Sequence, residues 1–479
     1  MEPQNLNFGG GTTQTFLSPI VLLAVVIAGV MICVAGRRKA LAAFLAGTIL
    51  IPPDQVLYLG ALHFPMLRIL ALCGLGRITW TKWKKKEPIF SGGVNWIDRL
   101  MIVMTIVTLI DGMLLWQVWQ QLVFQLGNLV TVFGAYFLLR YLIRDGDDIR
   151  QGLQALAVIA GIVAFLMVFE QATGRNLLYS TLGGARANVL GNAISRDDKL
   201  RSAGSFAHPI LAGTFGGILL PLFVGLWIKN RDNRKFAALG VASCCVIPFA
   251  ASSSTALFGF MGGIAALCFW PLRRQMRLIR WGIVIVLVSL HLYMKSPVWH
   301  LISDIDLTGG SSSYHRYQLV NQCIVHFSDW VLVGTKNYAD WGWDMWDLSN
   351  QYVAIADTSG LIPLGCFVAI IVLGFRYMGR AHAAFRGDRK SQLFAWALGS
   401  SLFANVVAFF GISYFDQTIV AWYALLAMIC ATAASARKEL RAKASLNSDQ
   451  IVPPDVNHEQ EYVSPLAHAS RSVGLSISQ

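Results

Sequence analysis

Long apolar runs recur from near the N-terminus to about residue 435, and they constrain the fold of this chain more than any other feature. A helix needs about 20 apolar residues to cross the hydrocarbon core of a bilayer. Hydrophobic residues make up 55% of the chain and charged residues only 14%, whereas about 25% of the residues of a soluble protein are charged. The sequence therefore predicts an all-α fold, a polytopic transmembrane helix bundle of about 12–13 spans with a large extracytoplasmic loop. The expected spans cover roughly residues 17–36, 40–60, 62–80, 97–118, 121–142, 153–172, 208–228, 236–252, 255–272, 281–295, 359–378, 392–413 and 417–435.

The net charge of +13 comes from short basic clusters that fall between the apolar runs. Such clusters are typical of cytoplasmic connections, which carry an excess of Lys and Arg. The charge therefore indicates orientation, and we predict no nucleic-acid partner. The N-terminus is expected outside and the C-terminus in the cytoplasm. The clusters lie at residues 37–39, 82–86, 229–235, 273–280, 376–390 and 437–443.

This orientation divides the chain into two parts. Residues 1–443 form the predicted transmembrane domain, which includes two outward loops at 173–206 and 296–357. Residues 444–479 are polar, with Pro453 and Pro454, and are predicted to be a disordered cytoplasmic tail. The eight cysteines show neither a disulfide framework nor metal-ligand spacing. We predict no metal and no cofactor.

The two outward loops carry opposite charge. Loop 296–357 is acidic and rich in tryptophan, with seven Asp residues against Arg316 and Lys336. Loop 173–206 is basic, although basic residues on the outer face run against the orientation rule. One interpretation is an anionic ligand such as a phosphate or pyrophosphate, which arginine grips in a bidentate manner. The alternative is that the basic residues pair with the acidic loop. The basic residues are Arg175, Arg186, Arg196, Lys199 and Arg201.

A short motif leads from the basic loop into the next span. It reads Arg-Ser-Ala-Gly-Ser-Phe-Ala-His-Pro and extends from Arg201 to Pro209. Proline suits the first turn of a helix, and a helix N-terminus attracts anions. Arg201 and this helix start together predict a phosphate pocket at headgroup level. An isolated interfacial arginine would instead simply reach toward lipid phosphate.

This motif resembles the Arg-x-x-Gly-Thr-Phe-x-His-Pro segment of the O-antigen ligase and polymerase superfamily. The large loop is similar to that family's loop in order and position: His315-Arg316-Tyr317, then Trp330 to Gly334, then Asp347 to Tyr352, then Gly360 to Gly365. The resemblance covers roughly residues 150–430. It implies a metal-independent membrane glycosyltransferase of the bacterial inner membrane, with its active site on the outer face. Such an enzyme transfers or polymerises glycan from an undecaprenyl-pyrophosphate carrier during O-antigen or exopolysaccharide assembly.

The resemblance also implies roles for individual residues. Arg201 and Arg316 would hold the pyrophosphate and stabilise the leaving group. The position of the family's catalytic histidine is occupied here by Ser349, which cannot act as a base near neutral pH without help. Asp344 and Asp347 are therefore the candidate bases. The candidate substrate-binding residues are His208, His315, Arg196, Lys199, Asn350, Tyr352 and Trp343.

Several alternatives remain open at this point. Trp343 and its neighbours suit a platform for sugar rings and equally suit an aromatic belt at the membrane surface. The chain can also be interpreted as a transporter or flippase of lipid-linked glycans, or as a non-catalytic scaffold of polysaccharide assembly. Transporters usually show broken helices and internal repeats, whereas the polar residues here gather in an outward loop. The expected partners are the lipid-linked donor, a glycan or lipid acceptor, and membrane lipids.

Overall fold

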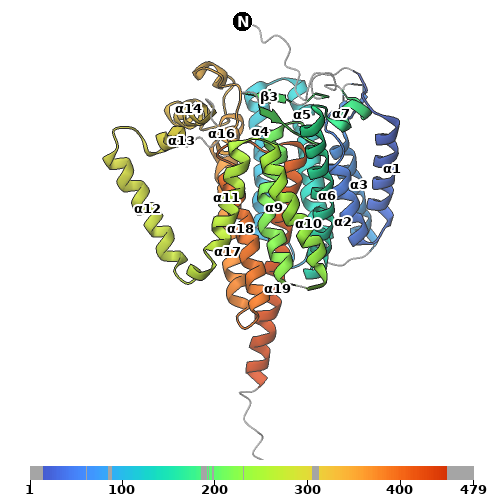
Figure 1. The fold of residues 1–479 in the computed structure, drawn as a ribbon, viewed down its shortest axis with the longest axis vertical. Helices are drawn as coiled ribbons and strands as arrows, with labels where there is room; N and C mark the ends of the chain where they lie inside the picture. Colours follow the sequence, from blue (N-terminus) through green and yellow to red (C-terminus); the bar gives the residue numbers. More distant parts are fainter. Residues whose placement is uncertain are drawn as a thin grey trace, which may run out of the picture.

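A computed structural model describes residues 14–60, 62–84, 89–184, 191–192, 194–196, 199–229, 231–304 and 312–449. The protein is a bundle of long helices that run side by side along one axis (Figure 1). Eight helices are long and apolar enough to cross a membrane, and α1 and α11 are shorter apolar helices. The predicted all-α, multi-pass fold is confirmed at this level.

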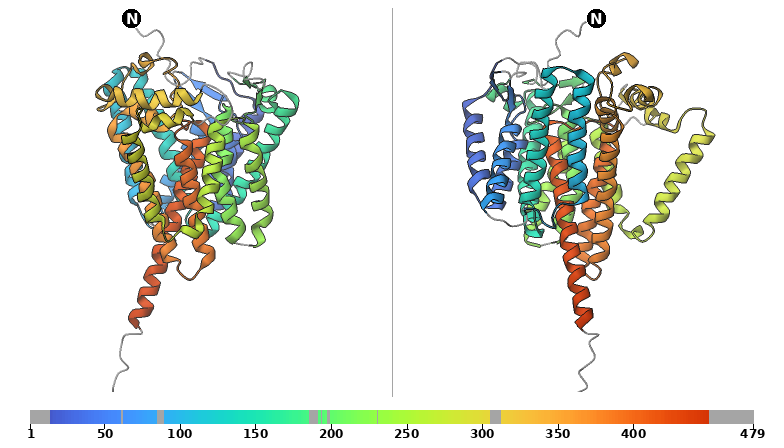
Figure 2. Two further views of the ribbon diagram at one scale, coloured as in Figure 1. Left: turned by 60° about the vertical axis from the view of Figure 1, so that its left-hand side comes forward. Right: turned by 180° about the vertical axis from the view of Figure 1, so that it is seen from behind.

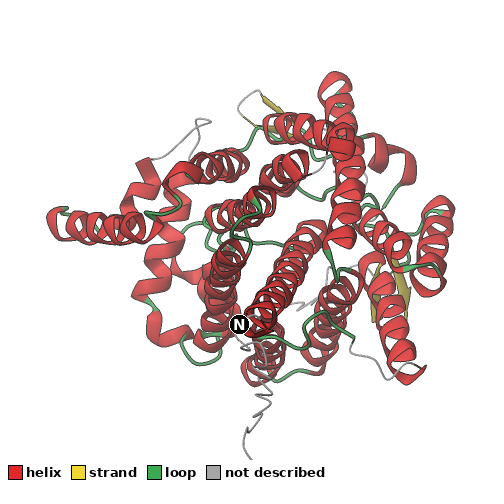
Figure 3. Ribbon diagram, turned by 90° about the horizontal axis from the view of Figure 1, so that it is seen from below, coloured by secondary structure: helices red, strands yellow, loops and turns green. Residues whose placement is uncertain are grey.

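Each predicted span overlaps one helix of the bundle. Viewed from below, most of these helices are seen nearly end-on and adjacent to one another (Figure 3). The helices are α1 (Pro19–Val34), α2 (Arg37–Ile49), α3 (Met66–Lys84), α4 (Trp96–Trp116), α5 (Trp119–Leu142), α6 (Gly146–Thr173), α9 (Pro209–Lys229), α10 (Arg234–Ala250), α11 (Ser254–Cys268), α12 (Met276–Tyr293), α17 (Leu361–Ala384), α18 (Arg389–Ala408) and α19 (Asp416–Asp449).

The second predicted span, 40–60, is shorter than expected. Helix α2 ends at Ile49, and the chain then forms a hairpin of β1 (Val56–Leu59) and β2 (Leu62–Pro65). Pro52 and Pro53 explain the break, because proline lacks the N–H that a helix interior needs and clashes with the preceding turn. The third span accordingly begins at Met66 rather than at residue 62.

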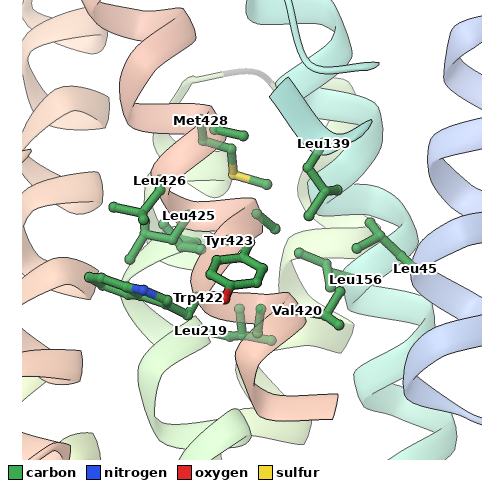
Figure 4. Close-up of a cluster of buried hydrophobic side chains, with 14 of the residues drawn as sticks. Leu45, Leu139, Leu156, Leu219, Val420, Trp422, Tyr423, Leu425, Leu426 and Met428 are labelled. Carbon is green, nitrogen blue, oxygen red and sulfur yellow. The ribbon is translucent and has the colours of Figure 1, made fainter. Parts of the chain in front are cut away.

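The core of the bundle is centred on α19. This helix is the most buried of the candidate spans, and Figure 4 shows its Trp422, Tyr423 and Leu426 among leucines of the surrounding helices. Helix α19 continues to Asp449, so the chain is still helical beyond residue 443, where we predicted the disordered tail to begin. Residues 450–479 of that tail lie outside the described part of the chain.

Both predicted outward segments lie at the same end of the bundle, which we call the loop end (Figures 1 and 2). Segment 173–206 forms α7 (Leu177–Leu182) and an antiparallel hairpin of β3 (Ile194–Arg196) and β4 (Lys199–Arg201). The far end, where α19 leaves the bundle, is called the tail end. The N-terminal side of α1 and the C-terminal side of α19 therefore lie at opposite ends, as the orientation prediction requires.

Segment 296–357 is largely helical rather than an open loop. Leu319, Cys323, Trp330, Val353 and Ala356 form part of a small buried cluster inside it. This cluster gives the segment a core of its own on top of the bundle. Its elements are η3 (Val298–His300), α13 (Leu301–Asp304), α14 (Ser312–Val325), α15 (Phe327–Trp330), η4 (Tyr338–Trp341) and α16 (Gln351–Ser359).

Helix α12 leads into this segment and stands away from the other helices (Figures 1 and 2). None of its residues is buried, and apolar side chains such as Leu278, Ile283 and Ile285 are more than half exposed. A helix with this composition and exposure is suited to contact with lipid on all sides.

A buried ion pair joins α4 and α5 near the tail end. The Arg140 guanidinium donates from Nε to Asp98 Oδ1 at 2.9 Å and from Nη2 to Asp98 Oδ2 at 3.0 Å. The Tyr136 hydroxyl donates to Asp98 Oδ1 at 2.6 Å. Both charged side chains are fully buried, so the pair is a structural contact of the bundle.

Candidate functional site

The segment that begins at Arg201, which we predicted to bind an anion, is hydrogen-bonded to the turn between α10 and α11. The Ser202 N–H donates to the Ala250 carbonyl at 3.1 Å, and the Ser252 hydroxyl donates to the Leu200 carbonyl at 3.2 Å. Gln171 Nε2, at the end of α6, donates to both carbonyl oxygens, at 2.9 Å to Leu200 and 2.8 Å to Ala250. These bonds fix the backbone that carries Arg201.

Glu170 supports the same segment from below. One of its carboxylate oxygens, Oε2, accepts the N–H groups of Ala203 at 3.0 Å and Gly204 at 2.9 Å. Asn176 Nδ2 donates to this oxygen at 3.0 Å and to the Gly204 carbonyl at 2.8 Å. Gly204 has φ of +61°, a conformation in which a side chain would be strained. The glycine of the Arg-x-x-Gly motif thus allows the backbone turn whose N–H groups bind the Glu170 carboxylate.

Arg201 and Arg316 meet at the α10–α11 turn from two directions. Arg201 Nε donates to the Ala251 carbonyl at 3.4 Å. Arg316 Nη2, on α14, donates to the Thr255 hydroxyl at 2.7 Å. Each arginine is only 7% exposed. The structure therefore brings the two arginines, which are far apart in the sequence, to Ala251 in the α10–α11 turn and to Thr255 in the first turn of α11, four positions further on.

The Thr255 hydroxyl is itself held in place. It donates to the Gly411 carbonyl at 3.1 Å, so that its lone pairs are left to accept from Arg316. A Cβ atom on Gly411 would lie 2.5 Å from the Thr255 oxygen, and this close approach explains why glycine stands there. Thr255 positions Arg316 through this chain of hydrogen bonds.

His208 lies beside Arg201 at the start of α9. Burial, together with the positive charge of Arg201, lowers the pKa of His208 to about 4, so the imidazole is neutral near pH 7. Its Nδ1 accepts the Ile210 N–H at 3.3 Å. This bond assigns the remaining proton to Nε2, which is then a donor. A neutral donor next to an arginine suits an anionic ligand.

His315 precedes Arg316 on α14 and is also buried, at 7% exposed. Its Nε2 lies 2.9 Å from the carbonyl oxygen of Asp344. Asp344 has φ of +61°, a left-handed conformation that is uncommon outside glycine. The contact ties the candidate base segment to the helix that carries Arg316. The Asp344 side chain is partly exposed, and that of Asp347 is exposed.

The other predicted residues of this segment divide into buried and exposed ones. Asn350 is buried and caps α16, where its Oδ1 accepts the N–H groups of Tyr352 at 3.0 Å and Val353 at 3.2 Å. The Tyr352 ring contacts Phe367, Phe409 and Phe410. Both residues therefore position α16. Trp343 is 74% exposed and is available to an external ligand or to the membrane surface.

The structure describes only some of the basic residues that we predicted in loop 173–206. Arg196 and Lys199 oppose each other in the β3–β4 hairpin, and the structure describes their backbone but not their side chains. Arg186 lies outside the described residues. Among the described residues, no group of three His, Cys, Asp or Glu side chains is arranged to hold a metal ion.

Three further residues shape the site. Glu170 accepts hydrogen bonds from two backbone N–H groups and from Asn176 Nδ2. Gln171 and Asn176 did not stand out in the sequence, because a single amide side chain carries no pattern. The only signal in the sequence was their position close to Glu170, because an ionisable residue within a span usually pairs with nearby polar groups.

Neither a scan against protein-family models nor a search of curated proteins finds a match to this chain. The class of protein that the fold defines is a multi-pass helical membrane protein with a structured cap at its loop end.

Proposed function

We propose that the protein is a membrane glycosyltransferase that takes a glycan from a polyprenyl-pyrophosphate donor at the loop end of the bundle. The observation that supports this most is the meeting of Arg201 and Arg316 at one turn, with both guanidinium groups largely buried. Two arginines at one place suit a diphosphate, because planar guanidinium groups form paired hydrogen bonds with phosphate oxygens.

The reaction follows from this placement. An acceptor hydroxyl oxygen forms a bond to the anomeric carbon of the donor sugar, and the bond from that carbon to the diphosphate oxygen breaks. The diphosphate leaves with the electron pair, and its growing negative charge is stabilised by Arg201 and Arg316 in an environment poor in water. The neutral His208 adds an N–H donor toward the same group.

The proton of the acceptor hydroxyl needs a base. Asp344 and Asp347 are the proposed candidates in place of Ser349. Asp344 is the stronger of the two, because its backbone is held by His315, the neighbour of Arg316, whereas Asp347 is exposed. The acceptor is a glycan or a lipid-linked glycan.

The test compares Arg201→Ala and Arg316→Ala with Arg175→Ala. Arg175 is an exposed arginine of the same outward segment and serves as the matched control. Binding of undecaprenyl diphosphate to the purified protein measures the pyrophosphate site without requiring knowledge of the sugar. We expect both site variants to lose binding and glycan transfer, and Arg175→Ala to retain them.

Folding is checked by size-exclusion profile and thermal midpoint. If both folded site variants bind undecaprenyl diphosphate as the wild type does, the proposal is wrong. If they bind it less tightly but polymerisation or ligation of a lipid-linked oligosaccharide is absent even in the wild type, the site binds pyrophosphate and the enzyme assignment fails.

A further inference from the structure

A cavity of about 570 Å³ lies between α2, α3, α4, α5, α16 and the loop-end half of α19. Its volume is in the range of small-molecule sites, about 300–1,000 Å³. Neither Arg201 nor Arg316 lines it, so it is distinct from the candidate pyrophosphate site. Its lining includes Phe409, just after α18, and Gln417, in the first turn of α19; Gln417 Nε2 donates to the Ser205 carbonyl at 2.8 Å, next to the segment that carries Arg201.

The cavity extends along the helices. Its lining on α4 runs from Met101 to Thr108, which is about 10 Å at 1.5 Å per residue. On α5 it runs from Phe124 to Val132, about 12 Å by the same measure. Because α4 begins at the tail end, Met101 marks the deep part of the cavity. The cavity therefore extends over about two helical turns along the bundle axis.

Arg68 lies at mid-length of this cavity. Its Nε donates to the Thr131 hydroxyl on α5, and its guanidinium lies beside Gly127, where an added Cβ would be 2.6 Å from the guanidinium carbon. Apolar lining residues lie on both sides of this level, Phe124 toward the loop end and Met101 toward the tail end. A ligand that fits this lining has a polar group at Arg68 and an apolar chain against the neighbouring helices.

Arg68 carries positive charge into this cavity. Its Nη1 donates to the His63 carbonyl at 2.6 Å and its Nε to the Thr131 hydroxyl at 3.3 Å. Among the described residues, no carboxylate forms an ion pair with it within 4.0 Å. The other charged lining residue is Asp416 at the start of α19. Ionisable side chains at membrane depth that line a cavity usually mark a ligand, and a cation without a carboxylate partner selects an anionic one.

We propose that this cavity binds a membrane lipid with a phosphate headgroup, with the phosphate at Arg68 and one apolar chain between α4, α5 and α19. The occupant is a lipid rather than a free phosphate, because most of the lining is apolar and offers a dissolved phosphate ion few polar partners in exchange for water. The site is a second one, and it does not rest on the proposed glycosyl transfer.

The test uses a matched pair of ligands that differ only in the phosphate. Purified protein in a neutral detergent is titrated with dioleoyl phosphatidic acid or with dioleoyl glycerol, and bound lipid is counted by native mass spectrometry. We expect phosphatidic acid to bind at least tenfold more tightly. Arg68→Gln should abolish this preference, and Arg68→Lys should keep part of it, because lysine binds phosphate as a point charge.

Two further variants complete the design. Thr108→Trp fills the middle of the cavity and should prevent binding of either lipid while leaving Arg68 in place. Arg99→Gln removes an exposed arginine on α4 outside the cavity and should leave binding unchanged. If Arg68→Gln does not fold, Arg68→Lys and Thr108→Trp still decide the outcome.

Three results would overturn the proposal. One is equal affinity for phosphatidic acid and dioleoyl glycerol. Another is lipid binding by Thr108→Trp that equals that of the wild type. The third is displacement of the bound lipid by inorganic phosphate at equal concentration, which would identify a headgroup site without a bound chain.

Discussion

Replacing Thr255 by valine removes one hydroxyl and keeps the volume of the side chain nearly unchanged. The hydroxyl accepts from Arg316 Nη2 at 2.7 Å and donates to the Gly411 carbonyl at 3.1 Å. Thr255→Val therefore leaves Arg316 without the acceptor that holds its guanidinium at the α10–α11 turn. Thr255 acts through Arg316 and is a positioning residue.

The expected size of the effect follows from this hydrogen bond. A bond to a charged group contributes about 1.5–3 kcal/mol. If that energy is what keeps Arg316 in the geometry that binds diphosphate, the dissociation constant for undecaprenyl diphosphate should rise roughly 10- to 150-fold. Gly411→Ala should act in the same direction, because the added Cβ would lie 2.5 Å from the Thr255 oxygen.

The assay measures binding of undecaprenyl diphosphate to purified variants, and kcat/KM for transfer where a donor is available. Thr255→Ser restores the hydroxyl and should recover most of the affinity. Thr79→Val is the matched control, because the Thr79 hydroxyl donates to carbonyls of its own helix, α3, away from the site. In an Arg316→Ala background, Thr255→Val should add little, because the two changes remove the same interaction. Wild-type affinity in a folded Thr255→Val variant would refute this reasoning.

Two further predictions concern pH and stability. His208 has a folded pKa of about 4, lowered from its usual value of about 6.5. Between these pH values the unfolded chain binds more protons than the folded one, so the wild type should lose stability as pH falls from 6.5 to 4. A series of thermal midpoints should show a smaller loss in His208→Gln, and an unchanged slope in this variant would contradict the assignment. Arg140→Met leaves Asp98 buried without its partner, which costs about 3–5 kcal/mol; a thermal midpoint equal to that of the wild type in the same detergent would show that the pair contributes nothing to stability.

The helices of the bundle were predictable because a membrane span is a local signal. An apolar run of the right length needs its own backbone hydrogen bonds whatever its neighbours are. Pro52 and Pro53 shortened one helix, and this effect could have been predicted from the sequence. The helices of segment 296–357 were missed, because α14 is mixed in polarity and gains its stability from the small cluster around Leu319 and Trp330.

The contacts of the candidate site were harder to predict than its residues. Arg201 and Arg316 stood out by charge and by motif. The pairing of Arg316 with Thr255 joins residues 61 positions apart, and no periodicity in one sequence encodes such a distance. The capping role of Asn350 was local and could have been predicted, since asparagine before a helix commonly caps it.

The isolation of α12 has a consequence for how this chain tolerates change. His291 at its end stacks on Trp299 and accepts the Val298 N–H, but none of the side chains of α12 is buried, so the order of residues along most of this helix matters little to the fold. Length and apolar character remain as requirements, because the helix must still carry the chain from one membrane surface to the other. The segment that bears Arg316 is thus joined to the bundle by a helix whose length and apolar character are constrained more strongly than the order of its residues.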